Sequence, residues 1–532
     1  MPRPRFTRRT FTLRPALGTD KGARLARRAA QPLVSSRLCH RNSQAARAVM
    51  GRSLAEAGPG GRMETSTLQR PVPARRPVSE WRLQIGHRRR LARADLLGVA
   101  AWVSAGMAIA LWLAAAPVRL ASPGDVITAA GIAAGMIGTD LILVMIVLAA
   151  RIPVIERTIG HDAAMTVHGS LGKPALYLLL AHAGLLVVGY AATDGSSWLA
   201  ETISLLTVSD VLLATLGLLG IAAVVITSIV AVRALLPYEA WYLIHLGSYV
   251  AVWIALPHQL SMGGMLAQGS WQRVYWLALY VGGFGAIVWF RFAVPLVRSI
   301  RHRVVVERVQ QVAPGVVSLW LRGRNLNELQ ARGGQFFIWR FWSGSTWWHG
   351  HPLSLSAAPT PTHARVTVRA LGHGSRRLAS LRRGTRVSFA GPYGIFSDQA
   401  RSRSRIAVAA SGIGVTPIRA FLENLDAAPG AVTILLRARS ERETYLWDEI
   451  LAWARDTGAA CYTSVGRRGA GSAAWLSATD EARGVSAATI WPDLAASDLY
   501  VCGPAGWADC VEADARRAGL HPEQLHRERF DW

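Results

Sequence analysis

The sequence has few cysteines and a low proportion of charged residues. Only four cysteines occur in 532 residues, and no two of them form a Cys-x-x-Cys pair. This excludes a disulfide-based scaffold, a zinc ribbon and an iron–sulfur cluster held by cysteines of this chain. Charged residues make up 17% of the chain, against about 25% in an average soluble domain, whereas apolar residues make up 51%. The composition therefore indicates a membrane protein.

Acidic residues are scarce, and the resulting positive charge is concentrated at the N-terminus. Residues 1–94 hold 22 basic and four acidic residues, in a segment rich in Pro, Gly and Ala with no apolar periodicity. Such a composition predicts a basic, disordered tail. Positive charge just before a first membrane helix is itself expected on the cytoplasmic side. The tail therefore needs no nucleic acid to explain it, and we expect no nucleic-acid partner.

Six apolar stretches, each long enough or nearly long enough to cross a bilayer, lie between residues 95 and 298. They predict a six-span transmembrane domain over 95–298. Basic residues gather in the second and fourth loops and after the sixth stretch, whereas the third loop carries only acids. By the positive-inside rule we expect a multi-pass protein of the plasma (inner) membrane with both termini in the cytoplasm. The expected spans are 96–117, 125–149, 164–191, 210–235, 239–257 and 273–297.

Four histidines fall in or at the ends of these spans, where ionisable side chains are costly and usually functional. His168 and His182 are on the third span, and His245 and His258 are on the fifth. Their spacings of 14 and 13 residues correspond to about 21 and 20 Å along a helix. Because both spans run in the same direction, the histidines form two pairs at two depths. This pattern suits two stacked b-type haems, each with an imidazole on both sides of the iron.

One detail complicates this interpretation. In an ideal helix, a residue thirteen positions after His245 lies on a different face from His245. We therefore expect Pro257 to distort the helix and re-aim His258. The alternative is that the four histidines only hydrogen-bond between helices.

Other polar residues near the spans have simpler explanations. We expect His161 to be solvated, and Arg151, Arg157 and Arg291 to be boundary charges rather than partners of haem propionates. Asp140 is either a paired polar anchor or part of a proton path.

After residue 303 the pattern changes to short β-type runs, which predict a small antiparallel barrel. From residue 405 strands alternate with helices, which predicts a parallel, doubly wound sheet. The fold class is therefore a multi-domain membrane protein, with a six-helix transmembrane bundle, an antiparallel β-barrel domain and an α/β nucleotide-binding domain.

Two glycine-containing turns are expected at one edge of the parallel sheet. Gly412 and Gly414 follow a strand and precede a helix, so the backbone there could approach a pyrophosphate, with Pro417 in the first helical turn. Cys502 ends a later strand. Because the carboxyl ends of parallel strands line one crevice, we expect both turns to face the same ligand.

Over about residues 95–532, these features resemble ferric-chelate reductases and NADPH oxidases, in which a ferric reductase-type transmembrane domain is fused to a ferredoxin–NADP reductase-like module. The resemblance implies a haem-binding domain at 95–298, an FAD-binding barrel at 302–398 and an NAD(P)-binding domain at 403–532. It also implies a set of cofactor-binding residues in family motifs: His351, Pro352, Leu353, Ser354, Gly372, Ser375, Gly391, Tyr393, Gly394, Gly412, Gly414, Thr416, Pro417, Cys502, Gly503, Pro504 and Trp532.

The same resemblance implies catalytic roles for Cys502 beside the nicotinamide and for Trp532, a terminal ring that stacks on the flavin and moves to admit nicotinamide. The sequence departs from the family at Leu353, where Phe is usual, and at Ser411, where Gly is usual. Leu186 stands where some superoxide-producing oxidases carry a further histidine. This departure weakens the case for dioxygen as acceptor.

The implied activity is transmembrane electron transfer from NAD(P)H, through FAD and two b-type haems, to an acceptor on the far side. A ferric chelate is the leading acceptor. Arg439, after the second strand of the nucleotide-binding domain, favours NADPH over NADH. The alternatives are an oxidase that forms superoxide, a subunit that supplies electrons to an extracytoplasmic redox partner, and a redox sensor with little turnover.

Overall fold

The structure is a computed structural model that describes residues 79–529, except 116–117, 262–265, 267, 345–348 and 371. All the elements described below belong to one compact unit, residues 74–532. Most of the expected basic tail and the terminal Trp532 lie outside the described residues.

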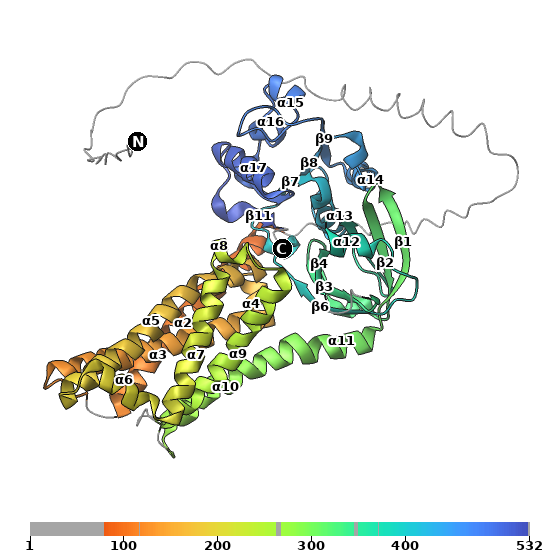
Figure 1. The fold of residues 1–532 in the computed structure, drawn as a ribbon. Helices are drawn as coiled ribbons and strands as arrows, with labels where there is room; N and C mark the ends of the chain where they lie inside the picture. The colour runs from red at the N-terminus through yellow and green to blue at the C-terminus, as the bar shows by residue number, and fades with distance from the viewer. Residues whose placement is uncertain are drawn as a thin grey trace, which may run out of the picture. The chain divides into compact units, whose positions relative to one another are not determined.

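Six helical segments in the described part of the chain are long and apolar enough to cross a membrane, as predicted. In the bundle, α3 packs along α5 and α7 packs along α9 (Figure 1). The six segments are α2 (Glu80–Ala115), α3 (Pro123–Ala149), α5 (His161–Asp194), α7 (Ser209–Ser228), α9 (Tyr238–Ser261) and Trp271–His302, which joins α10 (Trp271–Val288) to α11 (Val294–His302). Shorter helices lie between them, namely α4 (Pro153–Thr158), α6 (Trp198–Leu206) and α8 (Val230–Arg233).

The prediction that residues 80–94 belong to a disordered tail is wrong, because helix α2 begins at Glu80. The Pro- and Gly-rich composition that predicted disorder ends before Ser79, and arginine is a good helix former. With 36 residues, α2 is about 54 Å long, far more than the roughly 30 Å of a hydrocarbon core. Its first, arginine-rich half therefore extends beyond any span that the second half makes.

The region after α11 contains two three-stranded antiparallel sheets. Isolated bridges join their edges at Val305–Arg386 and Leu355–Val366, and their inner faces share one core that includes Leu319 and Phe337. The antiparallel character is therefore as predicted, whereas closure into one barrel remains a prediction. The strands are β1 (Val305–Ala313), β2 (Val316–Arg322) and β5 (His363–Arg369) in one sheet, and β4 (His351–Ser354), β3 (Phe336–Phe341) and β6 (Val387–Tyr393) in the other.

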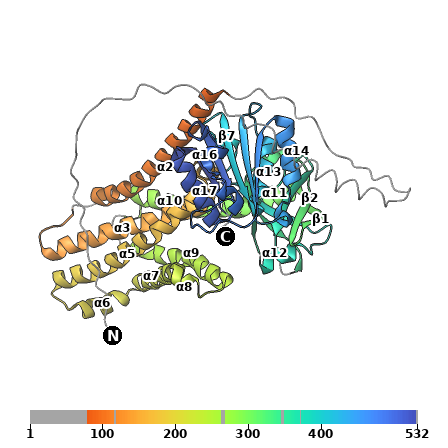
Figure 2. The same cartoon turned by 90° about the horizontal axis from the view of Figure 1, so that it is seen from above.

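A five-stranded parallel sheet follows, in the order β11-β10-β7-β8-β9. Alternate residues of its central strand enter cores on opposite faces: Val408 packs with helices α13 and α14, and Ala409 packs with α16 and α17 (Figure 2). The predicted doubly wound arrangement is therefore present. The strands are β7 (Arg405–Ser411), β8 (Val432–Ala438), β9 (Ala460–Val465), β10 (Ser497–Cys502) and β11 (Leu525–Glu528), and the helices are α13 (Val415–Asn424), α14 (Trp447–Thr457), α16 (Ala487–Ile490) and α17 (Ala505–Arg517).

Candidate functional site

The four membrane histidines form two facing pairs between α5 and α9. The ring centroids of His168 and His245 are 6.0 Å apart, and those of His182 and His258 are 6.2 Å apart. The structure therefore brings together the residues that the sequence paired, including His258 directly after Pro257 in α9.

These separations can be compared with the space that a metal needs. An imidazole nitrogen lies about 2.0–2.1 Å from a bound transition metal such as zinc, and roughly 1.1 Å from its own ring centre. Two imidazoles on opposite sides of one metal would therefore have centroids about 6.2–6.4 Å apart. Both observed pairs are within a few tenths of an ångström of this value, so the donor set fits bis-imidazole ligation.

Backbone carbonyls of α3 fix the orientation of the two histidines on α5. The Nδ1 atom of His168 lies 3.1 Å from the carbonyl oxygen of Met145, and that of His182 lies 2.9 Å from the carbonyl oxygen of Gly131. A carbonyl oxygen only accepts, so each Nδ1–H donates and each Nε2 keeps its lone pair. This is the usual support for a histidine that ligates a metal.

The two α9 histidines have no such support. The Nδ1 atoms of His245 and His258 are buried and have no hydrogen-bond partner among the described residues. The ring of Trp241, one turn before His245, lies 5.2 Å from that histidine between centroids. Packing rather than hydrogen bonding therefore holds the α9 side of the inner pair.

A glycine on α3 makes room for His182, and it was not among the residues predicted from the sequence. A Cβ atom on Gly135 would lie 2.5 Å from Nδ1 of His182. Gly131 and Gly138, on the same face of α3, also pack closely against α5. The spacing of these small residues was the available signal, because small residues let membrane helices approach closely.

The predicted flavin motif lies on β4 and carries two buried polar atoms without partners in the described part of the chain. They are Nε2 of His351 and Oγ of Ser354. Burial, with a smaller contribution from nearby His349, lowers the pKa of His351 to about 4. Pro352 and Leu353 pair with β3. Neutral His351 and Ser354 therefore offer hydrogen-bonding atoms that a bound group could satisfy.

The predicted pyrophosphate segment lies next to this motif. Gly372 precedes the short helix α12 (His373–Leu378), and its amide donates to Oγ of Ser375 at 3.0 Å. A Cβ atom on Gly374 would lie 3.3 Å from the ring of His351. The structure thus brings the two segments together.

The third predicted segment, Gly391 to Gly394, includes the end of β6. It lies next to residues of the chain between α3 and α5. The guanidinium of Arg298 donates to the carbonyl of Gly391, and that of Arg151 lies 5.1 Å from the ring centre of Tyr393. A cavity of about 700 Å³ adjoins these residues. Its lining includes Arg151, Arg157, Arg298, Arg332, Tyr393 and Gly394.

His161 was expected to be solvated, and this prediction is wrong. Its side chain is 5% exposed and its Nδ1 lies 3.0 Å from a carboxylate oxygen of Glu156. Its ring centroid lies 6.1 Å from those of both Tyr393 and Phe336. The position looked solvated because only the folded sheets cover it. The first residue of α5 is therefore packed against the Gly391–Gly394 segment.

At the parallel sheet, the two predicted turns meet as expected. Gly412 has a φ of +56°, and a Cβ atom on Gly414 would overlap the carbonyl oxygen of Cys502. The hydroxyl of buried Thr416 donates to the carbonyl of Ile413 at 2.9 Å, which holds the turn in shape. Pro417 is in the first turn of α13.

Cys502 is fully buried at the end of β10, followed by Gly503 and by Pro504, the residue before α17. Its neighbour in the sheet register is Glu528 on β11, a residue for which the sequence indicated no role of its own. Burial raises the pKa of both groups. A Cβ atom on Gly394 would lie 3.9 Å from the carboxylate of Glu528, so this acid is near the flavin segment as well.

Arg439 is exposed directly after β8, in the predicted place. Arg437, two residues earlier on β8, is buried, and its guanidinium donates to the carbonyls of Ala438, Ser464 and Gly466. It therefore joins the carboxyl ends of β8 and β9. Trp532 lies outside the described residues.

Residues 134–256 match the model of the family described as ferric reductase like transmembrane component. This confirms the predicted resemblance for the membrane segment, which includes three of the four paired histidines. No curated protein sequence matches the chain.

Three solved structures are examples of those similar to parts of this chain. One is the flavohaem-like FAD/NAD binding domain of nitric oxide dioxygenase from Vibrio cholerae, with 20% identity, 43% of this chain and 99% of that chain covered, and a TM-score of 0.36. Another is flavohaemoglobin from Malassezia yamatoensis, with 17% identity, coverages of 76% and 97%, and a TM-score of 0.37. The third is the cytochrome b5 reductase domain of Ulva prolifera nitrate reductase, with 16% identity, coverages of 43% and 98%, and a TM-score of 0.34.

Proposed function

We propose that this protein is an NAD(P)H-dependent oxidoreductase that transfers electrons across a membrane, through FAD and two b-type haems, to a ferric chelate on the far side. The observation that carries the proposal is the pair of matched histidine separations, 6.0 and 6.2 Å, between two helices of the ferric reductase-like segment. Four isolated histidines that served only as interhelical hydrogen-bond donors would have no reason to face one another at this distance.

In this proposal His168 and His245 hold the inner haem, and His182 and His258 hold the outer one. The carbonyls of Met145 and Gly131 orient two of the four ligands and increase the basicity of their Nε2 atoms. The bound groups supply the redox chemistry, with flavin linking the two-electron nicotinamide to one-electron haem iron. The helices supply position and exclude water, so that charge crosses about 30 Å of hydrocarbon without a pore.

His351 and Ser354 are the residues proposed to bind the flavin, with Gly372 and Ser375 beside its pyrophosphate and the Gly391–Gly394 segment at its edge. Support comes from the two buried atoms on β4 that lack partners in the described residues. It also comes from the contact between Tyr393 and His161. His168 follows His161 by seven residues on α5, about 10 Å along the axis. The flavin segment is thereby close to the inner histidine pair.

The crevice at the ends of β7 and β10 is proposed to bind NAD(P)H. Gly412 and Gly414 leave the backbone open to a pyrophosphate, Thr416 and Pro417 fix the turn, and the Cys502–Pro504 segment lies near the nicotinamide. Arg439 is the proposed contact for a 2′-phosphate, so we expect Arg439→Ala to raise KM for NADPH and leave KM for NADH unchanged. Trp532 is proposed as the ring that covers the flavin before nicotinamide enters.

A ferric chelate is preferred to dioxygen because of Leu186, one turn after His182. Some superoxide-producing oxidases carry a further histidine at this position, whereas Leu186 is apolar and packs against Gly131. The assay is NADPH oxidation by the full-length protein loaded with FAD and haem, with ferric citrate as acceptor. We expect ferrous iron to form at a rate unaffected by superoxide dismutase. Iron reduction abolished by superoxide dismutase would make dioxygen the acceptor. Absence of sustained turnover with either acceptor would contradict the proposed reductase activity.

A further inference from the structure

The first half of helix α2 has a surface role that the proposed function does not require. Residues 80–95, called here the α2 arm, are rich in charged residues and precede the apolar half of the helix. Two groups of contacts connect the arm to residues more than 300 positions away. One group reaches the chain segment between β6 and β7, and the other reaches the turn before β11.

The first contact joins the arm to the segment that connects the antiparallel sheets to the parallel sheet. A carboxylate oxygen of Glu80 lies 3.5 Å from the guanidinium of Arg403, and the other accepts a hydrogen bond of 3.2 Å from Oγ of Ser404. Helix α2 also packs against residues Asp398–Ala400 of the same connecting segment.

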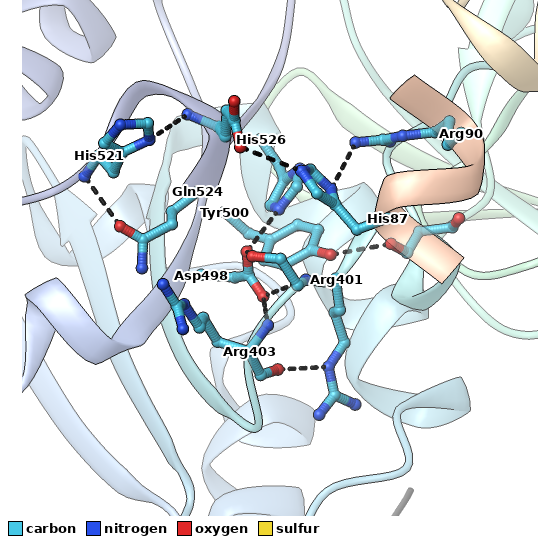
Figure 3. A network of polar contacts seen from close by, with 12 residues as sticks. His87, Arg90, Arg401, Arg403, Asp498, Tyr500, His521, Gln524 and His526 are labelled. Carbon is cyan, nitrogen blue, oxygen red and sulfur yellow. Dashed lines mark hydrogen bonds and ion pairs between the residues drawn. The ribbon is translucent and has the colours of Figure 1, made fainter. Parts of the chain in front are cut away.

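The second contact joins the arm to the turn before β11. His87, labelled in Figure 3, is 7% exposed. Its Nε2 lies 3.4 Å from a carboxylate oxygen of Glu523. On the other side of the ring, the guanidinium of Arg90 donates to Nδ1 of His87 at 3.3 Å. Because Nδ1 accepts this bond, Nε2 carries the proton and donates to Glu523. Arg90 therefore orients His87 toward the sheet.

A single carboxylate connects these two regions inside the protein. Asp498, at the start of β10, accepts hydrogen bonds from the amides of Ser402 and Arg403 at 2.8 and 2.6 Å. It also accepts one of 2.9 Å from Oγ of Ser402 and one of 3.0 Å from Nε2 of His526 (Figure 3). The connecting segment is thus fixed to the sheet on its inner side and contacted by the arm on its outer side.

The position of this network matters for the site. Asp498 is at the amino end of β10, whereas Cys502 is at its carboxyl end, where the nucleotide crevice lies. We propose that the α2 arm docks on the connecting segment and on the turn at Glu523, and so holds the nucleotide-binding part from the edge opposite its crevice. The partner of this surface is the chain's own first helix. Docking of the arm depends neither on the acceptor nor on the haems.

The test measures the distance between the arm and the parallel-sheet part in the full-length protein. Spin labels are placed at Arg82→Cys and Arg483→Cys, two exposed positions, after Cys39, Cys461 and Cys510 are replaced by Ser. We expect a narrow distance distribution in this parent. His87→Ala combined with Glu80→Arg should lengthen the mean distance and broaden the distribution at least twofold.

Two further variants separate docking from general damage. Arg89→Glu changes the charge of the arm by the same two units as Glu80→Arg, at an exposed position, and should leave the distribution unchanged. Compared with Glu80→Arg alone, Glu80→Arg combined with Arg403→Glu should recover much of the narrow distribution, because the ion pair re-forms with its charges exchanged. Identical distributions in the parent and in His87→Ala/Glu80→Arg would overturn the proposal. Equal broadening by Arg89→Glu and by Glu80→Arg would also overturn it.

Discussion

The ring of His182 lies where a single methyl group on Gly135 would come within 2.5 Å of its Nδ1 atom. The same Nδ1 donates to the carbonyl of Gly131, one turn earlier on α3. Helix α3 therefore both anchors this histidine and leaves the space that its ring occupies. A change on α3, which contributes none of the proposed ligands, should disturb the proposed outer haem site.

We predict that Gly135→Ala displaces the ring of His182 and reduces haem from about two to about one per chain. The physical reason is that the ring cannot keep its bond to Gly131 and avoid the new methyl group. Haem quantified per purified chain measures the loss. Gly184→Ala, two residues after His182, is the control, because a Cβ atom there would meet nothing within 4 Å. Full haem content in Gly135→Ala would show that His182 does not need this space.

His182→Leu should remove the outer haem and stop electron transfer to the far-side acceptor, while NADPH still reduces the flavin. The physical reason is that His258 alone would leave the outer iron without its second imidazole. His168→Leu is the matched change in the inner pair and should remove the other haem. Flavin bleaching and haem content are measured on the same samples. Two haems retained in His182→Leu would contradict the assignment of this pair.

Gly414→Ala should slow flavin reduction by NADPH by about 10²-fold or more. A Cβ atom at this position would overlap the carbonyl oxygen of Cys502, so the two turns of the nucleotide crevice would have to separate. Dithionite, which needs no nucleotide site, should still reduce the flavin. Gly506→Ala, in the helix after the same turn, meets nothing within 4 Å and should react normally. Equal rates of flavin reduction in Gly414→Ala and Gly506→Ala would contradict the proposal that NADPH binds in this crevice.

The partly buried His351 should make the protein less stable in mild acid. Its pKa is about 4 in the folded chain, against 6.5 for an unperturbed side chain. Between these values the unfolded chain binds more protons at this residue, so the free energy of unfolding falls as the pH is lowered. After allowance for partial exposure, we expect this residue to make the free energy of unfolding about 1 kcal/mol lower at pH 5 than at pH 7. Urea unfolding at both pH values should show a smaller change in His351→Gln, and equal changes would contradict the prediction.

Much of the architecture was predictable because it depends on patterns along the chain. The spans follow from runs of apolar residues, and the doubly wound sheet follows from strands that alternate with helices. The histidine pairs could be inferred from the 14- and 13-residue spacings, with Pro257 needed to explain the second. These features are local, so the order of residues is enough to indicate them.

What the sequence did not indicate depends on contacts between distant segments. His161 is buried because Tyr393 and Phe336 cover it, and Arg437 is buried because three backbone carbonyls at the ends of β8 and β9 surround its guanidinium. The helical arm of α2 was missed because its arginines suggested disorder, whereas its contact with Glu523 involves a residue 436 positions away from His87. No local pattern in the sequence indicates contacts of this kind.

The central claim is that reducing equivalents from NADPH reach two haems held by four histidines. The most direct measurement is a reduced-minus-oxidised visible spectrum of the purified, detergent-solubilised protein, with NADPH as reductant and haem quantified per chain. We expect two b-type haems per chain, both reduced by NADPH. A bleached flavin with no haem signal would contradict the claim, and the four histidines would then need a different role.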